Sequence, residues 1–277
     1  MKRAAMVVLL MCGIAVCESS AEGLSTVAVL RSGRTFLPLR DICQWLGEEV
    51  GYSAGSITIT GQGISLRLTV GSAQAVLNGQ TVALDAPVFE IQGVSYAPVR
   101  FMGESFGAKV ECPSPCRMLT MRREDDEVSV TVVVDRGDRL TYQGAWFDID
   151  YPRGFRALER ERSGSASGYD SASFLSPDGS VELFVYSPQW SGTTYWTSLG
   201  PGETEASRTE SAEGNLHYTR VMITGPGGAY QRAWVEVRDT LTNTNHIFGI
   251  KYADQAAYDR YRDAYLRFKD SLVQYAD

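Results

Sequence analysis

Histidine is scarce in this chain of 277 residues. The two histidines, His217 and His246, are too few for a metal centre held by three imidazoles, and no substitute cluster of ligands is present. The sequence also lacks a phosphate-binding Gly-rich loop, an HExxH helix, a CxxC pair and a calcium loop. The stretch 164–168 has Ala166 where a nucleophile elbow needs a nucleophile. We therefore predict no metal and no cofactor.

Clusters of basic residues are absent as well. The chain has 26 Lys and Arg against 33 Asp and Glu, which gives a formal charge of −7. Nucleic-acid binding needs a basic surface that neutralises phosphates, so we predict that nucleic acid is not a partner. With 44% hydrophobic and 21% charged residues, the composition is that of a globular protein, and the length suffices for two ordinary domains.

Long apolar runs are missing apart from one near the N-terminus. Lys2 and Arg3 precede an apolar run over residues 4–16, which is too short to span a membrane stably. Small residues follow, so we predict a signal peptide at residues 1–21. Lipidation at Cys17 is the alternative, and it would give the protein its only contact with a membrane. The predicted location is extracytoplasmic: the periplasm, the cell surface or the medium.

The chain has five cysteines, and two of them lie close together. Cys112 and Cys116 enclose two prolines, which stiffen a tight turn. An exported protein meets oxidising conditions, so we predict a disulfide between Cys112 and Cys116, with free thiols as the alternative. The closed ring would be short, so it would brace one loop and little else. Cys43 falls on the apolar face of a predicted helix, where we expect it to be buried.

One short phrase occurs twice, first as FLPLR at residues 36–40 and then as YAPVR at residues 96–100. The residues before each proline are held extended, and the proline itself suits the first turn of a helix. Apolar residues follow at helical spacing, and each predicted helix ends at a glycine, Gly47 or Gly107, that suits a C-terminal cap. Each copy therefore predicts a strand that runs into a helix.

Extended segments with alternating polarity follow each predicted helix: 57–60 and 64–70, then 118–121 and 128–134. The charged residues 122–127 are expected to form the solvated tip of the second hairpin. The predicted unit is strand–helix–strand–strand, used twice, with a connecting piece at residues 72–92. An internal repeat of this kind indicates a binding scaffold more than an enzyme.

The doubled phrase, with its apolar helix, Gly and Val, resembles the copper amine oxidase N-terminal-like domain. The resemblance covers residues 24–135. It implies a small α+β domain without catalytic activity, which occurs mostly in secreted bacterial proteins and is attributed to association with the envelope or cell wall. It does not imply copper, because the chain has too few histidines.

Arg40 and Arg100 occupy the same unusual position in the two copies. A cation in the first turn of a helix opposes the helix dipole by a few tenths of a kcal/mol, so each arginine is expected to be held by another group. The structural interpretation is a salt bridge or a bond to loop carbonyls. The functional interpretation is a pair of quasi-equivalent sites for an anionic or sugar ligand.

The second half of the chain is predicted to be mainly antiparallel strands, reached through a linker at residues 136–140. Strand-like segments recur along it: 147–151, 173–175 and 181–185 around a Ser-Pro-Asp-Gly turn, 217–224, 230–237 and 246–252. Both histidines lie in these segments, either as ordinary strand residues or as one site shared by adjacent strands. The polar segments 159–168 and 187–214 are predicted loops. The second contains Trp190, Tyr195 and Trp196, which either pack locally or stack on sugar rings.

The last segment changes from a period of two to spacings of three and four. Its aromatic and apolar residues form one stripe: Tyr258, Tyr261, Tyr265, Phe268, Leu272 and Tyr275. Asp254 is placed to cap this predicted helix at its N-terminus. We expect the stripe to pack on the preceding sheet, and an exposed partner or membrane surface is the alternative.

An antiparallel sheet that opens with WFDIDYPRGF at residues 146–155 and is closed by a helix resembles the PsbP-like fold, over residues 141–277. That family is largely non-enzymatic and contains extracytoplasmic accessory and lipid-anchored proteins. The predicted fold class is α+β with two domains. A small domain built from strand-helix-strand-strand repeats precedes an antiparallel sheet packed by a C-terminal helix.

These features predict a non-enzymatic exported envelope protein, a binding or structural module for cell-wall glycan or for another envelope protein. The alternative is a carboxylate-dependent hydrolase in the periplasm or at the cell surface. Asp148 and Asp150 share one face of a strand, which suits acid/base work or cation binding but is also ordinary for a solvated face. A concave acidic pocket with a perturbed carboxylate would favour the enzyme.

Overall fold

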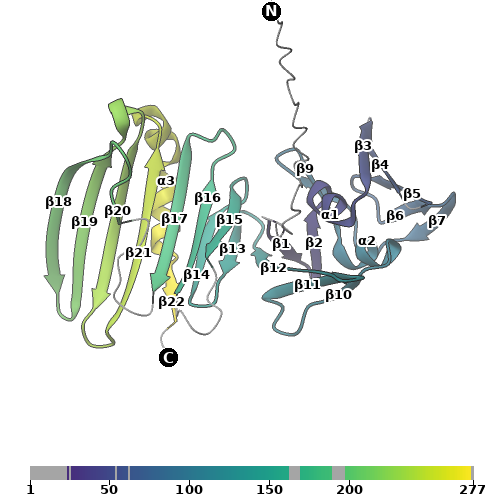
Figure 1. Cartoon of the computed structure of the whole chain (residues 1–277), viewed down its shortest axis with the longest axis horizontal. Helices are drawn as coiled ribbons and strands as arrows, with labels where there is room; N and C mark the ends of the chain where they lie inside the picture. The colour runs from purple at the N-terminus through teal and green to yellow at the C-terminus, as the bar shows by residue number, and fades with distance from the viewer. Residues whose placement is uncertain are drawn as a thin grey trace, which may run out of the picture.

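The computed structural model describes residues 24, 26–53, 55–61, 63–161, 169–188 and 197–275. Within these residues the protein is mostly β, with three β-sheets and three α-helices, and its class is α+β (Figure 1). The predicted signal peptide with Cys17 lies outside the described residues, and so does the aromatic cluster of Trp190, Tyr195 and Trp196. No helix in the described part of the chain is long and apolar enough to cross a bilayer.

The middle of the molecule is a ten-stranded sheet, here called the junction sheet. Eight of its strands lie in the order β22 (Val273–Gln274), β14 (Phe147–Pro152), β13 (Arg139–Gln143), β12 (Asp126–Asp135), β1 (Ala28–Arg31), β2 (Arg34–Pro38), β9 (Val94–Pro98), β8 (Phe89–Ile91). The hairpin of β10 (Lys109–Glu111) and β11 (Met118–Arg123) extends the sheet from β12. Strands β1 and β12 pair in parallel.

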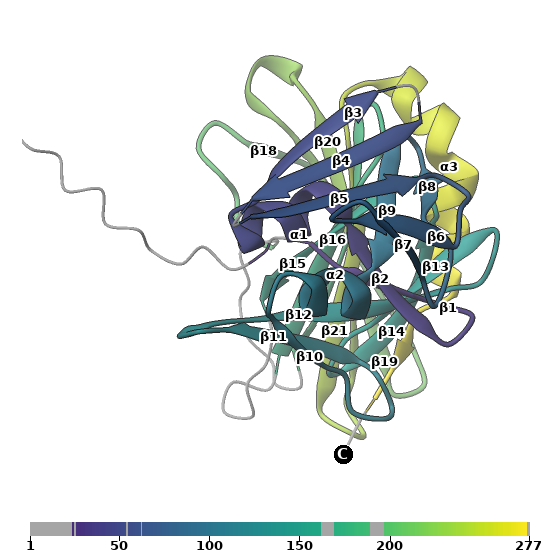
Figure 2. The same cartoon turned by 90° about the vertical axis from the view of Figure 1, so that its right-hand side faces the viewer.

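Two further sheets lie at the ends of the molecule (Figure 1), and Figure 2 is viewed from the end that carries the N-terminal sheet. The N-terminal sheet has the order β3 (Glu49–Ser53), β4 (Ser56–Gly61), β5 (Ile64–Thr69), β6 (Gln74–Leu77), β7 (Gln80–Ala83). The C-terminal sheet has the order β15 (Arg156–Glu161), β16 (Tyr169–Leu175), β17 (Val181–Pro188), β21 (Thr244–Tyr252), β20 (Gln231–Asp239), β19 (Leu216–Thr224), β18 (Thr204–Glu213). A 3-10 turn, η1 (Pro226–Gly228), precedes β20.

Both copies of the repeated phrase form a strand followed by a short helix, α1 (Leu39–Leu46) or α2 (Val99–Ser105). Gly47 ends α1 in the predicted left-handed conformation, with φ of 72°. The prolines lie one position earlier than predicted, because each is still part of its strand. Pro38 pairs with Tyr96 and Pro98 pairs with Phe36, so each proline is the extended residue before a helix.

Strands β2 and β9 relate the two copies by a local twofold axis. Leu37 pairs with its own equivalent, Ala97. The sequence of buried and exposed positions is the same, residue by residue, over 37–50 and 97–110. Because the two strands are antiparallel, α1 and α2 begin at opposite ends of the β2–β9 pair. The two repeated arginines are therefore carried to opposite ends of it.

Three segments contain more regular structure than their local pattern predicts. The expected connecting piece, residues 72–92, contains β6, β7 and β8, and the Asn78-Gly79 turn between β6 and β7 is a hairpin signal that does not depend on periodicity. The expected loop at 187–214 contains β18. Every residue of β18 is exposed, so this strand has no polar–apolar alternation to reveal it. The expected linker at 136–140 is the turn and the start of β13 in a hairpin with β12.

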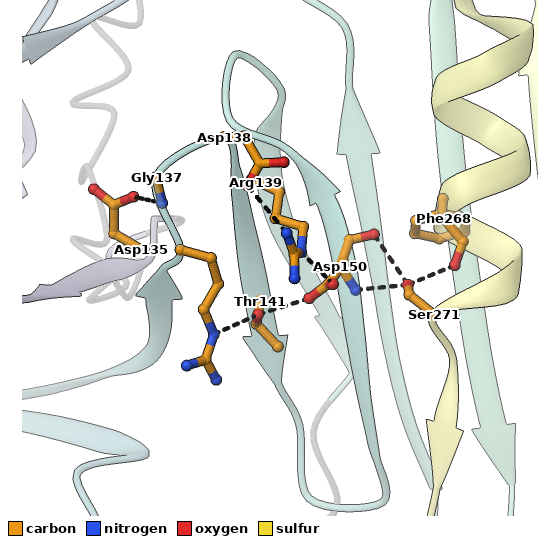
Figure 3. A network of polar contacts seen from close by, with 9 residues as sticks. Asp135, Gly137, Asp138, Arg139, Thr141, Asp150, Phe268 and Ser271 are labelled. Atoms are coloured by element: carbon orange, nitrogen blue, oxygen red, sulfur yellow. Dashed lines mark hydrogen bonds and ion pairs between the residues drawn. The ribbon is translucent and has the colours of Figure 1, made fainter.

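The hairpin at 136–140 is fixed by a polar network (Figure 3). Asp135 accepts a bond from the backbone N–H of Gly137 at 2.8 Å. Asp150, on the neighbouring strand β14, accepts bonds from Thr141 at 2.7 Å and from the Arg139 guanidinium at 2.6 Å. The backbone N–H of Asp150 donates to Ser271, which follows α3 (Gln255–Asp270), at 2.9 Å. The hairpin is therefore hydrogen-bonded to Asp150 on β14, and Asp150 is in turn hydrogen-bonded to Ser271.

The junction sheet separates the two main hydrophobic cores. Ala28 and Val132 point into the first core, with α1, α2 and the N-terminal sheet. Val29 and Val133, the next residues of the same strands, point into the second core. The second core also receives the predicted aromatic stripe of α3: Tyr258, Tyr261, Tyr265, Phe268 and Leu272. Asp254 caps α3 as predicted, accepting a bond from the backbone N–H of Ala257 at 2.8 Å.

Candidate binding groove

A groove of about 550 Å³ is lined by residues 26–96 on one side and by residues 140–177 on the other. One wall comes from the start of α1, from Tyr52 on β3 and from the β8–β9 hairpin, and includes Arg40 and Asp41. The other wall comes from the turn between β14 and β15, and includes Arg153 and Arg156. Residues far apart in the sequence thus line one cavity, which is the usual form of a ligand site.

Arg40, one of the two predicted ligand-binding residues, lines this groove. Its side chain is exposed, and its guanidinium lies 6.0 Å from the ring centroid of Tyr52. Among the described residues it has neither an ion pair nor a hydrogen bond. The expected salt bridge or carbonyl bond is therefore not found there. The exposed guanidinium does not need such a partner, because water solvates its charge.

Arg100 is also exposed and also lacks an ion pair or hydrogen bond within the described ranges. It does not line the groove, because α2 begins at the other end of the β2–β9 pair. The position that corresponds to Tyr52 in the second copy is Cys112. Cys112 forms a disulfide with Cys116, with a distance of 5.2 Å between the two Cα atoms. The two arginines are equivalent in sequence but have different surroundings.

Two tyrosines lie deep in the groove. Tyr96 stacks on Phe89 with a centroid distance of 5.1 Å. Burial, together with the charge of Asp41, raises the pKa of Tyr96 to about 12, and Arg153 acts in the opposite direction. Tyr151 is 2% exposed, burial raises its pKa, and its hydroxyl has no hydrogen-bond partner among the described residues. Both hydroxyls therefore remain protonated at neutral pH and can act as donors.

The second wall is tied to the first half of the chain. Arg153 donates to the backbone oxygen of Gly137 at 2.9 Å and to the carboxylate of Asp135 at 3.0 Å. Arg31, on β1, lies 3.7 Å from the same carboxylate, which is 3% exposed. A Cβ atom at Gly154 would lie 3.1 Å from the side-chain nitrogen of Gln92, so the two walls meet closely at that end.

The groove carries positive charge in an acidic protein. Arg40 and Arg156, one on each wall, are exposed and have no ion pair or hydrogen bond within the described part of the chain. Arg153 is neutralised by Asp135, and Asp41 is the one acidic side chain among the described lining residues. Two guanidinium groups beside aromatic rings form a site suited to an anionic ligand, because guanidinium binds carboxylate and phosphate in a planar, bidentate manner.

The carboxylates on which a hydrolase would depend are held by arginines. Asp148 lies 3.6 Å from Arg117, and Asp150 is bonded to Arg139. A second pocket, of about 450 Å³, lies on the C-terminal sheet and contains Glu203 bonded to Arg232. Burial opposes ionisation of Glu203, but the bonds from Arg232, from the Gly200 backbone and from Tyr230 prevail and lower its pKa to about 2. Such a carboxylate stays ionised and is a poor proton donor.

The histidines do not form a shared site. His217 lies on β19 opposite Arg238, whereas His246 lies on β21 opposite Val237, so their side chains are on opposite faces of the C-terminal sheet. His246 accepts or donates a bond of 2.7 Å with Gln274, and burial lowers its pKa. Within the described ranges no group of three His, Cys, Asp or Glu residues is placed to hold a metal ion.

Sequence reasoning identified Arg40 but not the other groove residues. Tyr96 belongs to the second copy of the repeated phrase, yet it lies in the groove beside the first copy, since β9 pairs with β2. That pairing would have placed Tyr96 near Pro38 had the local twofold axis been considered. Tyr151 and Arg156 carry no local signal, because only the packing of the two halves brings them there.

Comparison with known proteins agrees with the resemblance of the first part of the chain. Residues 19–121 match the family model of the copper amine oxidase N-terminal domain, which is a non-catalytic domain of those enzymes. The solution structure of cyanobacterial PsbP (CyanoP) from Synechocystis sp. PCC 6803 is similar at 14% identity, with a TM-score of 0.33, covering 47% of this chain and 86% of that chain. A search of curated proteins finds no match.

Proposed function

We propose that the protein is a non-catalytic binding module whose groove receives an anionic segment of cell-wall glycan. The observation that carries this proposal is the two guanidinium groups of Arg40 and Arg156, which have no ion pair or hydrogen bond among the described residues and lie on opposite walls of a groove that also presents Tyr52 and Tyr96. Aromatic rings offer flat apolar surfaces to sugar rings, and guanidinium groups bind carboxylates. The match of residues 19–121 to a non-catalytic accessory domain supports the same conclusion.

We further propose that the protein acts outside the cytoplasm, as two domains at 24–135 and 141–277. The basic and apolar N-terminal sequence and the Cys112–Cys116 disulfide support export. The two hydrophobic cores on either side of the junction sheet support two domains that share that sheet. Val29 on β1, a strand that contributes to both cores, lines the groove between these units.

The repeat supplies a matched control for a binding test. Purified protein is sedimented with insoluble peptidoglycan, and the bound fraction is measured against protein concentration. We expect Arg40→Ala to weaken binding about tenfold or more, since a charge-assisted hydrogen bond contributes about 1.5–3 kcal/mol. Arg100→Ala removes the equivalent exposed charge outside the groove and should bind as the wild type does.

Two outcomes would contradict the proposal. Failure of the wild-type protein to sediment with peptidoglycan would exclude this glycan as the ligand. Equal losses in Arg40→Ala and Arg100→Ala would show that net charge, and not the groove, controls retention. Binding to another envelope protein is the competing proposal, and it would be favoured if envelope extract retained the protein while peptidoglycan did not.

A further inference from the structure

The edge of the C-terminal sheet is an unusually open strand. Strand β18 is ten residues long, ends the strand order of its sheet and pairs with β19 alone among the described strands. All its residues are exposed. Figure 1 shows it at the extreme left, at the end of the molecule opposite the N-terminal sheet. Among the described strands none pairs with its outer row of backbone N–H and C=O groups, so this row can accept another strand.

Charged side chains protect an edge from unrelated strands, and they also select a strand with complementary charges. Arg208 and Glu210 lie on the same face of β18, because they are two residues apart. Glu210 has no ion pair or hydrogen bond within the described part of the chain. The Arg208 guanidinium donates hydrogen bonds to both carboxylate oxygens of Glu205, at 3.1 and 2.7 Å, and lies over the ring of Trp234. Arg208 is thus held by Glu205 and Trp234, beside a Glu210 carboxylate that has no ion pair or hydrogen bond among the described residues.

A second copy of β18 has the required charges in one register. A twofold axis perpendicular to the sheet makes the two strands antiparallel and requires one residue to face its own copy. With Thr209 on the axis, Arg208 of each chain faces Glu210 of the other, which gives two opposite-charge pairs. With Arg208 or Glu210 on the axis, like charges meet. With Ser207 or Ser211 on the axis, neither charged residue meets an opposite charge.

We propose that the protein forms a twofold dimer through β18, with Thr209 on the axis and the two C-terminal sheets joined into one. The like-charge contact in this register is Glu205 with the partner's Glu213, and by symmetry it occurs twice, once at each end of the paired segment. That contact is weakened in two ways. A β-bulge between Glu205 and Ser207 breaks the regular ladder there, and Arg208 already neutralises Glu205. The inference is independent of the groove and of any glycan.

The test measures the mass of the purified protein by light scattering from micromolar to submillimolar concentration. We expect a dimer, and we expect Arg208→Glu or Glu210→Arg alone to raise the dimer dissociation constant at least about tenfold, since two cross-strand pairs change from attraction to repulsion. The double variant Arg208→Glu/Glu210→Arg restores both pairs and should restore the dimer. The double variant lacks the bond from Arg208 to Glu205. A restored dimer would therefore result from the pairs between the two chains and not from that bond. Arg238→Glu makes the same change of net charge as Arg208→Glu but lies on β20, away from the edge. It should leave the dimer dissociation constant unchanged.

A cross-linking experiment checks the register. Thr209→Cys places a thiol opposite its own copy, so oxidation should link the two chains. Ser211→Cys places the thiol opposite Ser207 of the partner and should not link them. A monomer at every concentration would overturn the proposal, and so would a double variant no better than the single ones. A dimer in which Ser211→Cys cross-links and Thr209→Cys does not would overturn the register.

Discussion

The buried pair of Glu203 and Arg232 should make stability depend on pH in a definable window. Both side chains are 6% exposed, and two nitrogens of Arg232 bond the carboxylate at 3.2 and 2.6 Å. Burial disfavours the ionised carboxylate, but Arg232, the Gly200 backbone and Tyr230 outweigh that effect and lower the pKa of Glu203 from 4.5 to about 2. A shift of this size corresponds to about 3 kcal/mol of stability, since one unit is about 1.36 kcal/mol.

The sign follows from the direction of the shift. Because the folded state holds the ionised form, the contribution is complete above the unfolded pKa of 4.5 and is lost as the pH falls towards about 2. Glu203→Gln keeps the shape of the side chain but removes the charge that pairs with the buried Arg232. We expect the variant to be less stable than the wild type by about 3 kcal/mol at pH 7, with a difference that shrinks at acid pH.

The assay is urea denaturation of both proteins from pH 7 to pH 3, and the quantity compared is the difference between their free energies of unfolding. Glu127→Gln is the control, because Glu127 pairs with Arg122 at the exposed tip of a hairpin and should contribute little. A difference that stays constant over this pH range would refute the reasoning. So would a loss at pH 7 no larger than that of Glu127→Gln.

Two further predictions concern the second core and its helix. Phe174 is fully buried, with its ring 4.4 Å from that of Tyr151 and 5.4 Å from that of Phe268, so Phe174→Ala should lower the free energy of unfolding by about 3–5 kcal/mol in urea denaturation. A loss below about 1 kcal/mol would show that the site collapses around the cavity. Asp254→Ala removes the N-cap of α3 and should cost about 1 kcal/mol in the same assay, whereas Asp254→Asn should retain most of it.

Much of the architecture follows from local sequence patterns. The doubled phrase predicts both short helices, because proline limits the chain before it and glycine allows the left-handed turn after it, as Gly47 shows. The spacing of Tyr258, Tyr261 and Tyr265 predicts α3 and its buried face, and Asp254 predicts where α3 begins. Each of these patterns involves residues that are close together in the sequence, so it can be recognised without knowing the fold.

Where the sequence pattern did not predict a strand or hairpin, the missing information was which other strand the segment pairs with. Strand β18 shows no alternation, because neither of its faces is covered, and only pairing with β19 makes it a strand. The segment 136–140 resembles a linker by composition, but β12 and β13 pair across it and place it inside one sheet.

The sequence by itself determined the local elements of this protein: the repeated strand–helix starts and the capped terminal helix. Only the tertiary structure decided which arginine lines a groove. The antiparallel pairing of β2 with β9 sends Arg40 and Arg100 to opposite ends, and the packing of the turn after β14 against the β8–β9 hairpin builds a second wall at the Arg40 end alone. Equivalent sequences therefore acquire different surroundings, because a cavity depends on contacts between segments distant in the chain.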